Sequence, residues 1–196
     1  MRPLSGQTGV TILELAVALT ILAVMVSAAA PGFSDWISNS RILTLAESFQ
    51  NGLQLARIEA VRRNAPAYFQ IADSLTDSCN ESTTGANWVV RTDDADGGCA
   101  TSTTIIQSRP AAEGGTQLAV SAECSTLGFD SLGQLIERVG CEAPDDGHYD
   151  FNINVPGGQC VAGGGTLRCR RVRVALGGQI LICDPAVSAS GDPRRC

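Results

Sequence analysis

The chain opens with a polar segment that is followed by a long apolar run. Residues 1–9 (MRPLSGQTG) are polar and carry Arg2, whereas Val10 to Ala30 is apolar apart from Thr11, Glu14, Thr20 and Ser27. A helix of that length would span about 32 Å, which is enough for a hydrocarbon core of about 30 Å. We therefore expect residues 10–30 to form a helix that crosses a membrane once.

A second helical pattern extends from Phe33 to Asn64. Apolar residues recur there at steps of three or four, at Ile42, Leu45, Phe49, Leu53, Ala56 and Ala60. This spacing predicts an amphipathic continuation of the helix over residues 31–64, with one face packed on the rest of the chain. Charged residues, among them Glu59, should face water or neighbours, and Pro66 is a stop signal.

Beyond Pro66 the pattern changes to short β-prone runs separated by Gly, Asp and Asn. The runs are Ala67–Ile71, Asn87–Arg91, Thr104–Gln107, Gln117–Ser121, Leu127–Ile136, Tyr149–Val155, Arg171–Leu176 and Gln179–Cys183. They predict antiparallel sheets that pack against the second half of the helix. The fold class is therefore α+β, with a β-rich globular domain over residues 65–196.

The charge is unevenly distributed along the chain. The formal net charge of −6 speaks against DNA as a partner, because phosphate binding requires clustered cations. The last part of the chain nevertheless holds six arginines against two acidic residues, Asp184 and Asp192. These candidate DNA-binding residues are Arg168, Arg170, Arg171, Arg173, Arg194 and Arg195. The alternative is that they solvate an exposed face and pair with carboxylates.

The eight cysteines all lie between Cys79 and Cys196, within the predicted β-rich domain. An even number in this position favours disulfides formed in an oxidising compartment such as the periplasm. A zinc site is the competing interpretation, but the chain has no C-x-x-C motif and one histidine, His148. No nucleophile with an orienting acid is identifiable either. We expect no metal, no cofactor and no enzymatic activity.

Gly9 lies at the junction between the polar leader and the apolar run. Cleavage there would leave the hydrophobic helix on the mature chain, unlike cleavage of an ordinary signal peptide. Val10 would then carry a new α-amino group, with which the Glu14 carboxylate of a neighbouring subunit could pair. The alternative is that Glu14 is a single polar residue tolerated near the membrane surface. Arg2 agrees with a cytoplasmic N-terminus.

The segment GVTILELAVALTILAVMVSAAAPGF resembles the N-terminal signature of type IV prepilins and type II secretion pseudopilins. The resemblance implies that a prepilin peptidase cuts after Gly9 and methylates Val10, that Glu14 guides subunit assembly, and that Pro31 bends the helix. A proline has a physical reason to do so, because it lacks a backbone N–H. The chain departs from the signature at Val10, where the family usually has Phe.

Three further segments resemble the GspH/FimT group. They are LQLARIEAVRRNAPAYF (Leu53–Phe69), LGFDSLGQLI (Leu127–Ile136, an internal hairpin) and ICDPAVSASGDPRRC (Ile182–Cys196). The resemblance implies a minor pilin that acts in assembly or initiation of a type IV pilus with other minor and major pilins. It would be held in the inner membrane with its β-rich domain in the periplasm. The alternative is a GspH-like minor pseudopilin of type II secretion.

FimT-like pilins are implicated in DNA uptake through a G-R-x-R motif in the last hairpin. The corresponding residues, Gly178 to Leu181, lack both arginines. Arg171 and Arg173 lie nearby on one face of the preceding strand in either of two registers. One has a three-residue loop, Leu176–Gly178, and the other a two-residue Gly177–Gly178 turn.

The C-terminal tail is polar and has few apolar groups that could order it. A bond between Cys183 and Cys196 would pin it and contribute about 3 kcal/mol in the chain-entropy model. Proximity in sequence also suggests Cys160 with Cys169 and Cys124 with Cys141. Other pairings remain open, because eight cysteines allow about 105 connectivities.

Overall fold

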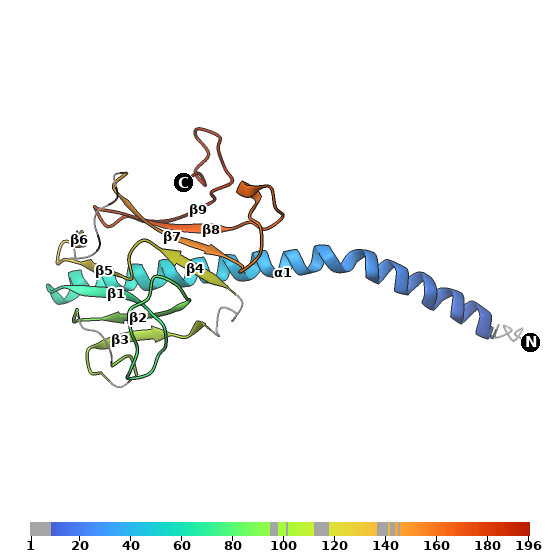
Figure 1. Ribbon diagram of the computed structural model, residues 1–196, viewed down its shortest axis with the longest axis horizontal. Helices are drawn as coiled ribbons and strands as arrows, with labels where there is room; N and C mark the ends of the chain where they lie inside the picture. The colour runs from blue at the N-terminus through green and yellow to red at the C-terminus, as the bar shows by residue number, and fades with distance from the viewer. Residues whose placement is uncertain are drawn as a thin grey trace, which may run out of the picture. The chain divides into compact units, whose positions relative to one another are not determined.

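One long helix, α1 (Ile12–Arg63), leads into a series of short strands (Figure 1). The structure is a computed structural model that describes residues 9–94, 98–100, 102–111, 118–136, 141, 144 and 146–196. The chain divides into two units, one up to Ile37 and the other from Ser38 to Cys196. The second unit contains both sheets, and the expected α+β fold is confirmed.

The strands form two antiparallel sheets. One sheet has the order β3-β2-β1-β5-β6, from β1 (Ala67–Ala72), β2 (Asn87–Arg91), β3 (Ile105–Arg109), β5 (Thr126–Phe129) and β6 (Leu135–Ile136). The other has the order β4-β7-β8-β9, from β4 (Ala119–Ala122), β7 (His148–Asn154), β8 (Arg170–Ala175) and β9 (Ile180–Cys183). A short 3-10 helix, η2 (Val161–Gly163), lies between β7 and β8.

The core lies where the second half of α1 meets both sheets. The ring of Phe49 on α1 is 5.5 Å from that of Phe69 on β1 and 5.9 Å from that of Phe151 on β7. The six apolar positions predicted on the helix, Ile42, Leu45, Phe49, Leu53, Ala56 and Ala60, are all buried, as expected. Their spacing places them on one face, and burial of that face holds α1 against the sheets.

Glu59 differs from the expectation that it faces water or a neighbouring molecule. It is only 9% exposed and accepts hydrogen bonds from Arg62 and Arg63 on the next turn of α1. These bonds, with Arg62 the larger contributor, lower the pKa of Glu59 to about 2. Two guanidinium groups therefore compensate a carboxylate that the packing of the helix removes from water.

α1 ends at Arg63 because the next residue, Asn64, adopts a left-handed backbone conformation with φ of 51°. The N–H of Asn64 donates to the carbonyl of Val61, and that of Ala65 donates to the carbonyl of Ala60. This is a Schellman motif with an asparagine in the left-handed position, and it satisfies carbonyls that the helix end leaves without partners. Pro66 then prevents continuation, as the sequence predicted.

Each predicted β-prone run overlaps an observed strand, although Gln117, at the start of one run, lies outside the described residues, and one run is divided. The run Leu127–Ile136 contains β5, a turn and β6, because Asp130 Oδ1 accepts hydrogen bonds from the N–H groups of Leu132 and Gln134. Gly133 has φ of 75° there, a conformation that glycine adopts readily. The resulting pairing of Phe129 with Leu135 is the internal hairpin that the resemblance implied.

Four disulfides connect the strands and loops of the second unit. They join Cys79 to Cys99, Cys124 to Cys141, Cys160 to Cys169 and Cys183 to Cys196. The last three are the pairs that the sequence suggested. The first lies in a second apolar cluster with Ala72 and Val89, between the sheet and the long loops around β2.

Among the described residues, no single helix is both long and apolar enough to cross a membrane. Two parts of α1, Ile12–Ser27 and Gly32–Arg63, meet that criterion together as a bent pair.

Two sequence predictions at this end fall outside what the structure describes. Residues 1–8 of the predicted leader are not described. Pro31 lies between the two parts of α1, where the side chains are not described, so its role as a kink stays a prediction.

Candidate functional site

The predicted cleavage junction lies just before α1 begins. Gly9 and Val10 are exposed and belong to no helix or strand, and Val10 is 72% exposed. The N–H of Glu14 donates to Thr11 Oγ1 at 3.2 Å, so Thr11 caps the helix that starts at Ile12. Thr11 and Glu14 have the spacing of a capping box. The peptide bond after Gly9 thus lies between two exposed, non-helical residues just before the capped start of the helix.

The first turns of α1 expose a continuous apolar surface. Large apolar side chains between 50% and 88% exposed occur throughout this segment: Val10, Ile12, Leu13, Leu15, Val17, Leu19, Ile21, Leu22, Val24, Met25 and Val26. Soluble monomers rarely expose contiguous apolar patches larger than a few hundred Å². An apolar environment or a partner must therefore cover this surface.

Glu14 is the acidic residue in this segment, and it lies in the first turn of α1. A carboxylate there interacts favourably with the partial positive charge at a helix N-terminus. This local role was missed in the sequence, although T-x-x-E before an apolar run is a readable signal. It explains why the helix tolerates Glu14, and it leaves the carboxylate exposed for a further partner.

Three of the candidate DNA-binding arginines lie on β8, where acidic residues already pair with them. Arg173 donates from Nε and Nη2 to the two carboxylate oxygens of Asp150 on β7, each at 2.9 Å, and these bonds raise the pKa of Arg173. Arg171 Nη1 lies 2.9 Å from Asp150 Oδ2. Arg170 pairs with Asp184. Each of the three β8 guanidinium groups thus pairs with one of two buried carboxylates, Asp150 or Asp184.

The remaining three candidates lie in loops. Arg194 donates from Nη2 to Asp192 Oδ2 at 2.8 Å, and this pairing lowers the pKa of Asp192 to about 2. Arg168 and Arg195 are exposed, and their side chains have no partner within the described ranges. The structure therefore does not gather the six arginines into one unneutralised patch.

The register of the last hairpin follows the first of the two alternatives. Val174 pairs with Ile180, Arg173 with Leu181, and Val172 with Ile182, which leaves Leu176–Gly178 as a three-residue loop. Arg171 and Arg173 consequently share the outer face of the sheet, opposite the buried Val172 and Val174.

Asp150 is the residue of this cluster that sequence reasoning missed. It precedes the β8 arginines by about 20 residues, and its role depends on the pairing of β7 with β8, in which it faces Arg173. One signal was available. Asp150 and Asn152 alternate with the apolar Tyr149, Phe151 and Ile153, which places both polar residues on the outer face of a strand.

Within the part of the chain that the structure describes, no group of three or more His, Cys, Asp or Glu residues could hold a metal ion. All eight cysteines are in disulfides.

Comparisons with known proteins fit this architecture. Residues 45–178 match the family described as Type II transport protein GspH. Crystal structures of the type IV minor pilin FimU from Pseudomonas aeruginosa are similar in fold. One is 16% identical with a TM-score of 0.50, covering 73% of this chain and 88% of FimU. A second FimU structure is 15% identical with a TM-score of 0.47, covering 71% and 90%.

Comparison with curated protein sequences gives no significant match. The family match covers well over half of the chain, and the long helix on antiparallel sheets is the pilin-like architecture that the resemblance implied. The chain therefore belongs to the GspH family and is a GspH/FimT-like pilin.

Proposed function

We propose that this chain is a minor pilin of a type IV pilus. A prepilin peptidase cuts between Gly9 and Val10 and methylates the new amine of Val10. Residues 10–30 then anchor the subunit in the inner membrane, with residues 31–64 as the amphipathic continuation and residues 65–196 as the periplasmic domain. From there the subunit joins other minor and major pilins and contributes to assembly or initiation of the filament.

The observation that carries this proposal is the apolar surface that starts at the candidate junction. Large apolar side chains from Val10 to Val26 are at least half exposed in the single chain, whereas the apolar face from Ile42 onward is buried. Removing the leader would place a free amine directly before this surface. A bilayer covers such a helix before assembly, and the helices of neighbouring subunits cover it afterwards.

Glu14 gives this surface a polar contact. Its position in the first turn lies close to the amine that cleavage would create at Val10. In an apolar filament core the carboxylate requires a compensating charge, and the Val10 amine of a neighbouring subunit supplies it. This contact would set the axial position of one helix against the next.

A pseudopilin of type II secretion is the second candidate, favoured by the family description Type II transport protein GspH. The similarity to FimU shows the fold alone. A deletion mutant of the host distinguishes the two. Loss of twitching and surface pili, with protein secretion intact, is the result expected of a pilus subunit. Loss of exoprotein release with normal piliation would instead assign the chain to secretion.

DNA binding is the weaker of the functions that the sequence suggested. Phosphate contacts depend on unneutralised cations along an extended surface. Here Asp150 and Asp184 are buried beneath the β8 arginines and pair with them, and Asp192 pairs with Arg194. A transformation assay on the same deletion mutant tests for DNA uptake separately from twitching.

A further inference from the structure

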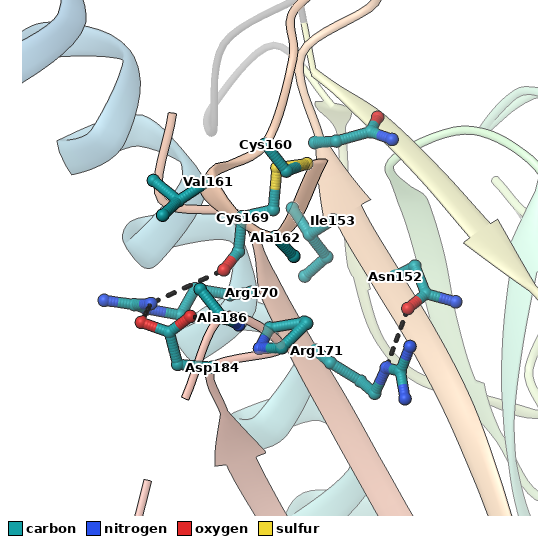
Figure 2. A pocket seen from close by; sticks show the side chains of 12 residues that line it. Asn152, Ile153, Cys160, Val161, Ala162, Cys169, Arg170, Arg171, Asp184 and Ala186 are labelled. Carbon is teal, nitrogen blue, oxygen red and sulfur yellow. Dashed lines mark hydrogen bonds and ion pairs between the residues drawn. A yellow bond between two sulfur atoms is a disulfide. The ribbon is translucent and has the colours of Figure 1, made fainter. Parts of the chain in front are cut away.

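A pocket of about 230 Å³ opens at the end of β7 and the start of β8. Figure 2 shows its wall of side chains, with Asn152 and Arg171 joined by one dashed line and Arg170 and Asp184 by another. Its volume equals the liquid volume of about eight water molecules. The pocket can hold a small organic molecule, but not a stretch of polymer.

Two disulfides hold the segments that form the pocket. Cys160–Cys169 closes the loop that carries Val161 and Ala162, and Cys183–Cys196 ties down the segment that carries Pro185. Asp184 further connects that segment to β8 through Arg170, and its Oδ1 accepts the N–H of Ala186. The walls are therefore fixed before any ligand binds, which lowers the entropic cost of binding.

Three side chains that line the pocket can donate hydrogen bonds to a ligand. Arg171 uses Nε for Asn152 Oδ1 at 2.8 Å and Nη1 for Asp150, so Nη2 has no partner within the described ranges. Because Asn152 accepts through its oxygen, its amide nitrogen remains available to donate. Asn154 lines the same pocket, and its side-chain amide makes no hydrogen bond to the described residues.

The carboxylates of Asp184, in the pocket wall, and of Asp150, which pairs with the wall residue Arg171, are both buried and already paired. Asp150 is 7% exposed and Asp184 5% exposed, and both carboxylates receive arginine hydrogen bonds. What a ligand meets is thus a guanidinium edge and two amides beside an apolar wall of Val161, Ala162 and Pro185. A cation would therefore find no unpaired carboxylate at this pocket among the described residues.

We propose that this pocket binds a small organic carboxylate with an apolar body, of about the size of an acylated amino acid. Arg171 Nη2 and the amides of Asn152 and Asn154 donate to the carboxylate, a charge-assisted contact that is stronger than a neutral one. Val161, Ala162 and Pro185 contact the apolar body. One of the wall segments that form the site, Asp184 to Ala186, lies beyond the residues that match the family.

The test is NMR titration of the isotopically labelled full chain in detergent micelles. The probes are N-acetyl-leucine and its neutral amide, N-acetyl-leucinamide. We expect saturable shifts of the Asn152 and Asn154 side-chain amides with the acid, at a Kd of about 1 mM for a ligand of this size. The neutral amide should bind at least about tenfold more weakly, because it lacks the charge that Arg171 recognises.

Arg171→Gln should weaken binding of the acid by about tenfold or more. Arg173→Gln is the matched control, since it pairs with the same Asp150 on the same face but does not line the pocket. It should leave the affinity unchanged. Asn154→Asp is a second test that leaves the Asp150 pairs intact, and its negative charge at the rim should also abolish binding.

Three results would overturn the proposal. The first is the absence of saturable shifts with N-acetyl-leucine up to about 20 mM, well above the expected Kd. The second is equal affinity for the acid and the neutral amide. The third is an equal loss in the Arg171→Gln and Arg173→Gln variants at unchanged melting temperatures, which would show that the charge of the face matters and the pocket does not.

Discussion

Gly52 marks the closest approach of α1 to the first sheet. A Cβ at this position would lie 2.7 Å from a ring carbon of Phe69 and 3.1 Å from Trp88. Glycine in a helix interior costs about 1 kcal/mol relative to alanine. Glycine is nevertheless favoured here, because a larger residue would push the helix away from the rings of Phe69 and Trp88.

Gly52→Ala should therefore lower the stability of the domain, although alanine is the better helix former. Overpacking of a dense core typically costs about 1–3 kcal/mol, which exceeds the propensity gain. Thermal unfolding followed by circular dichroism measures the effect. Gly32→Ala is the control in the same helix, since a Cβ there meets nothing within 4 Å. A higher melting temperature for Gly52→Ala would contradict the packing described.

Glu59 makes the stability of the domain depend on acid pH. Arg62 and Arg63 lower its pKa from 4.5 to about 2, so the carboxylate is more acidic in the folded chain than in the unfolded chain. Its contribution is fully present above pH 4.5 and is lost as the pH falls from 4.5 towards about 2.

Glu59→Gln should reduce stability at pH 7 by about 1 to 3 kcal/mol and flatten the acid limb of the stability curve. Urea unfolding at a series of pH values measures both effects. Glu47→Gln, an exposed carboxylate of the same helix, should change neither. If Glu59→Gln leaves the acid limb as steep as in the parent, the ion pairs with Arg62 and Arg63 do not stabilise the domain.

The ion pairs of Asp150 with Arg171 and Arg173 predict the outcome of a DNA-binding assay. Arg171 and Arg173 are both held by Asp150, so replacing them with Ala should remove little accessible positive charge. Gel-shift titration of the full chain in detergent at low salt should give weak binding that does not change in the double variant. A shift that disappears when both arginines become Ala would show that they contact phosphates despite Asp150.

At the scale of elements, the helix and the strands were largely predictable from periodicity. Apolar spacing of three or four identified the buried face of α1, and short runs bounded by Gly, Asp and Asn identified the strands. Local turn chemistry was less visible. The division of β5 from β6 depends on Asp130, whose carboxylate captures two backbone N–H groups in the turn.

The arrangement of strands into two sheets could not be read from the sequence. β4 pairs with β7 and not with the neighbouring β5, and β1 lies between β2 and β5. These contacts join residues far apart in the chain, where no local pattern specifies the partner. The contact of Asp150 with Arg173 depends on the pairing of β7 with β8, and it was missed for that reason.

The disulfide between Cys183 and Cys196 was predicted from the sequence, because the polar tail has few apolar groups that could order it. Cys183 and Cys196 are 13 residues apart, and their bond fixes a polar segment that begins where β9 ends. The backbone N–H of Asp184 also donates to the carbonyl of Arg194 at 2.7 Å. The disulfide and this hydrogen bond together hold the end of the tail beside the end of β9.

Replacing Cys183 and Cys196 by Ser should destabilise the domain by about 3 kcal/mol in urea unfolding, since the unfolded chain loses a loop constraint. Non-reducing peptide mapping of the parent should recover a peptide pair joined through these two residues. A peptide that links Cys183 to any other cysteine would contradict the connectivity.

At the scale of the whole molecule, the two units differ in whether their apolar side chains are buried or exposed. The unit from Ser38 onward buries its apolar face against two sheets and is closed by four disulfides. The unit up to Ile37 exposes its apolar side chains along the helix. The sequence predicted this contrast, because one helix pattern is apolar all round and the other has a single apolar face.

Glu14 has a local role at the helix start, and pairing with the Val10 amine of another subunit requires a contact between two copies or two different pilins. In the proposed scheme, cleavage after Gly9 comes before this pairing, because cleavage creates the amine.

The most direct test of the account is mass spectrometry of the chain extracted from membranes of a host that contains its prepilin peptidase. The account predicts a product that begins at Val10, carries one methyl group on its amine and retains the helix through Ala30. The same chain from a host without the peptidase should keep residues 1–9. An intact Met1 terminus in the presence of the peptidase, or a product that begins beyond Ala30, would contradict the account.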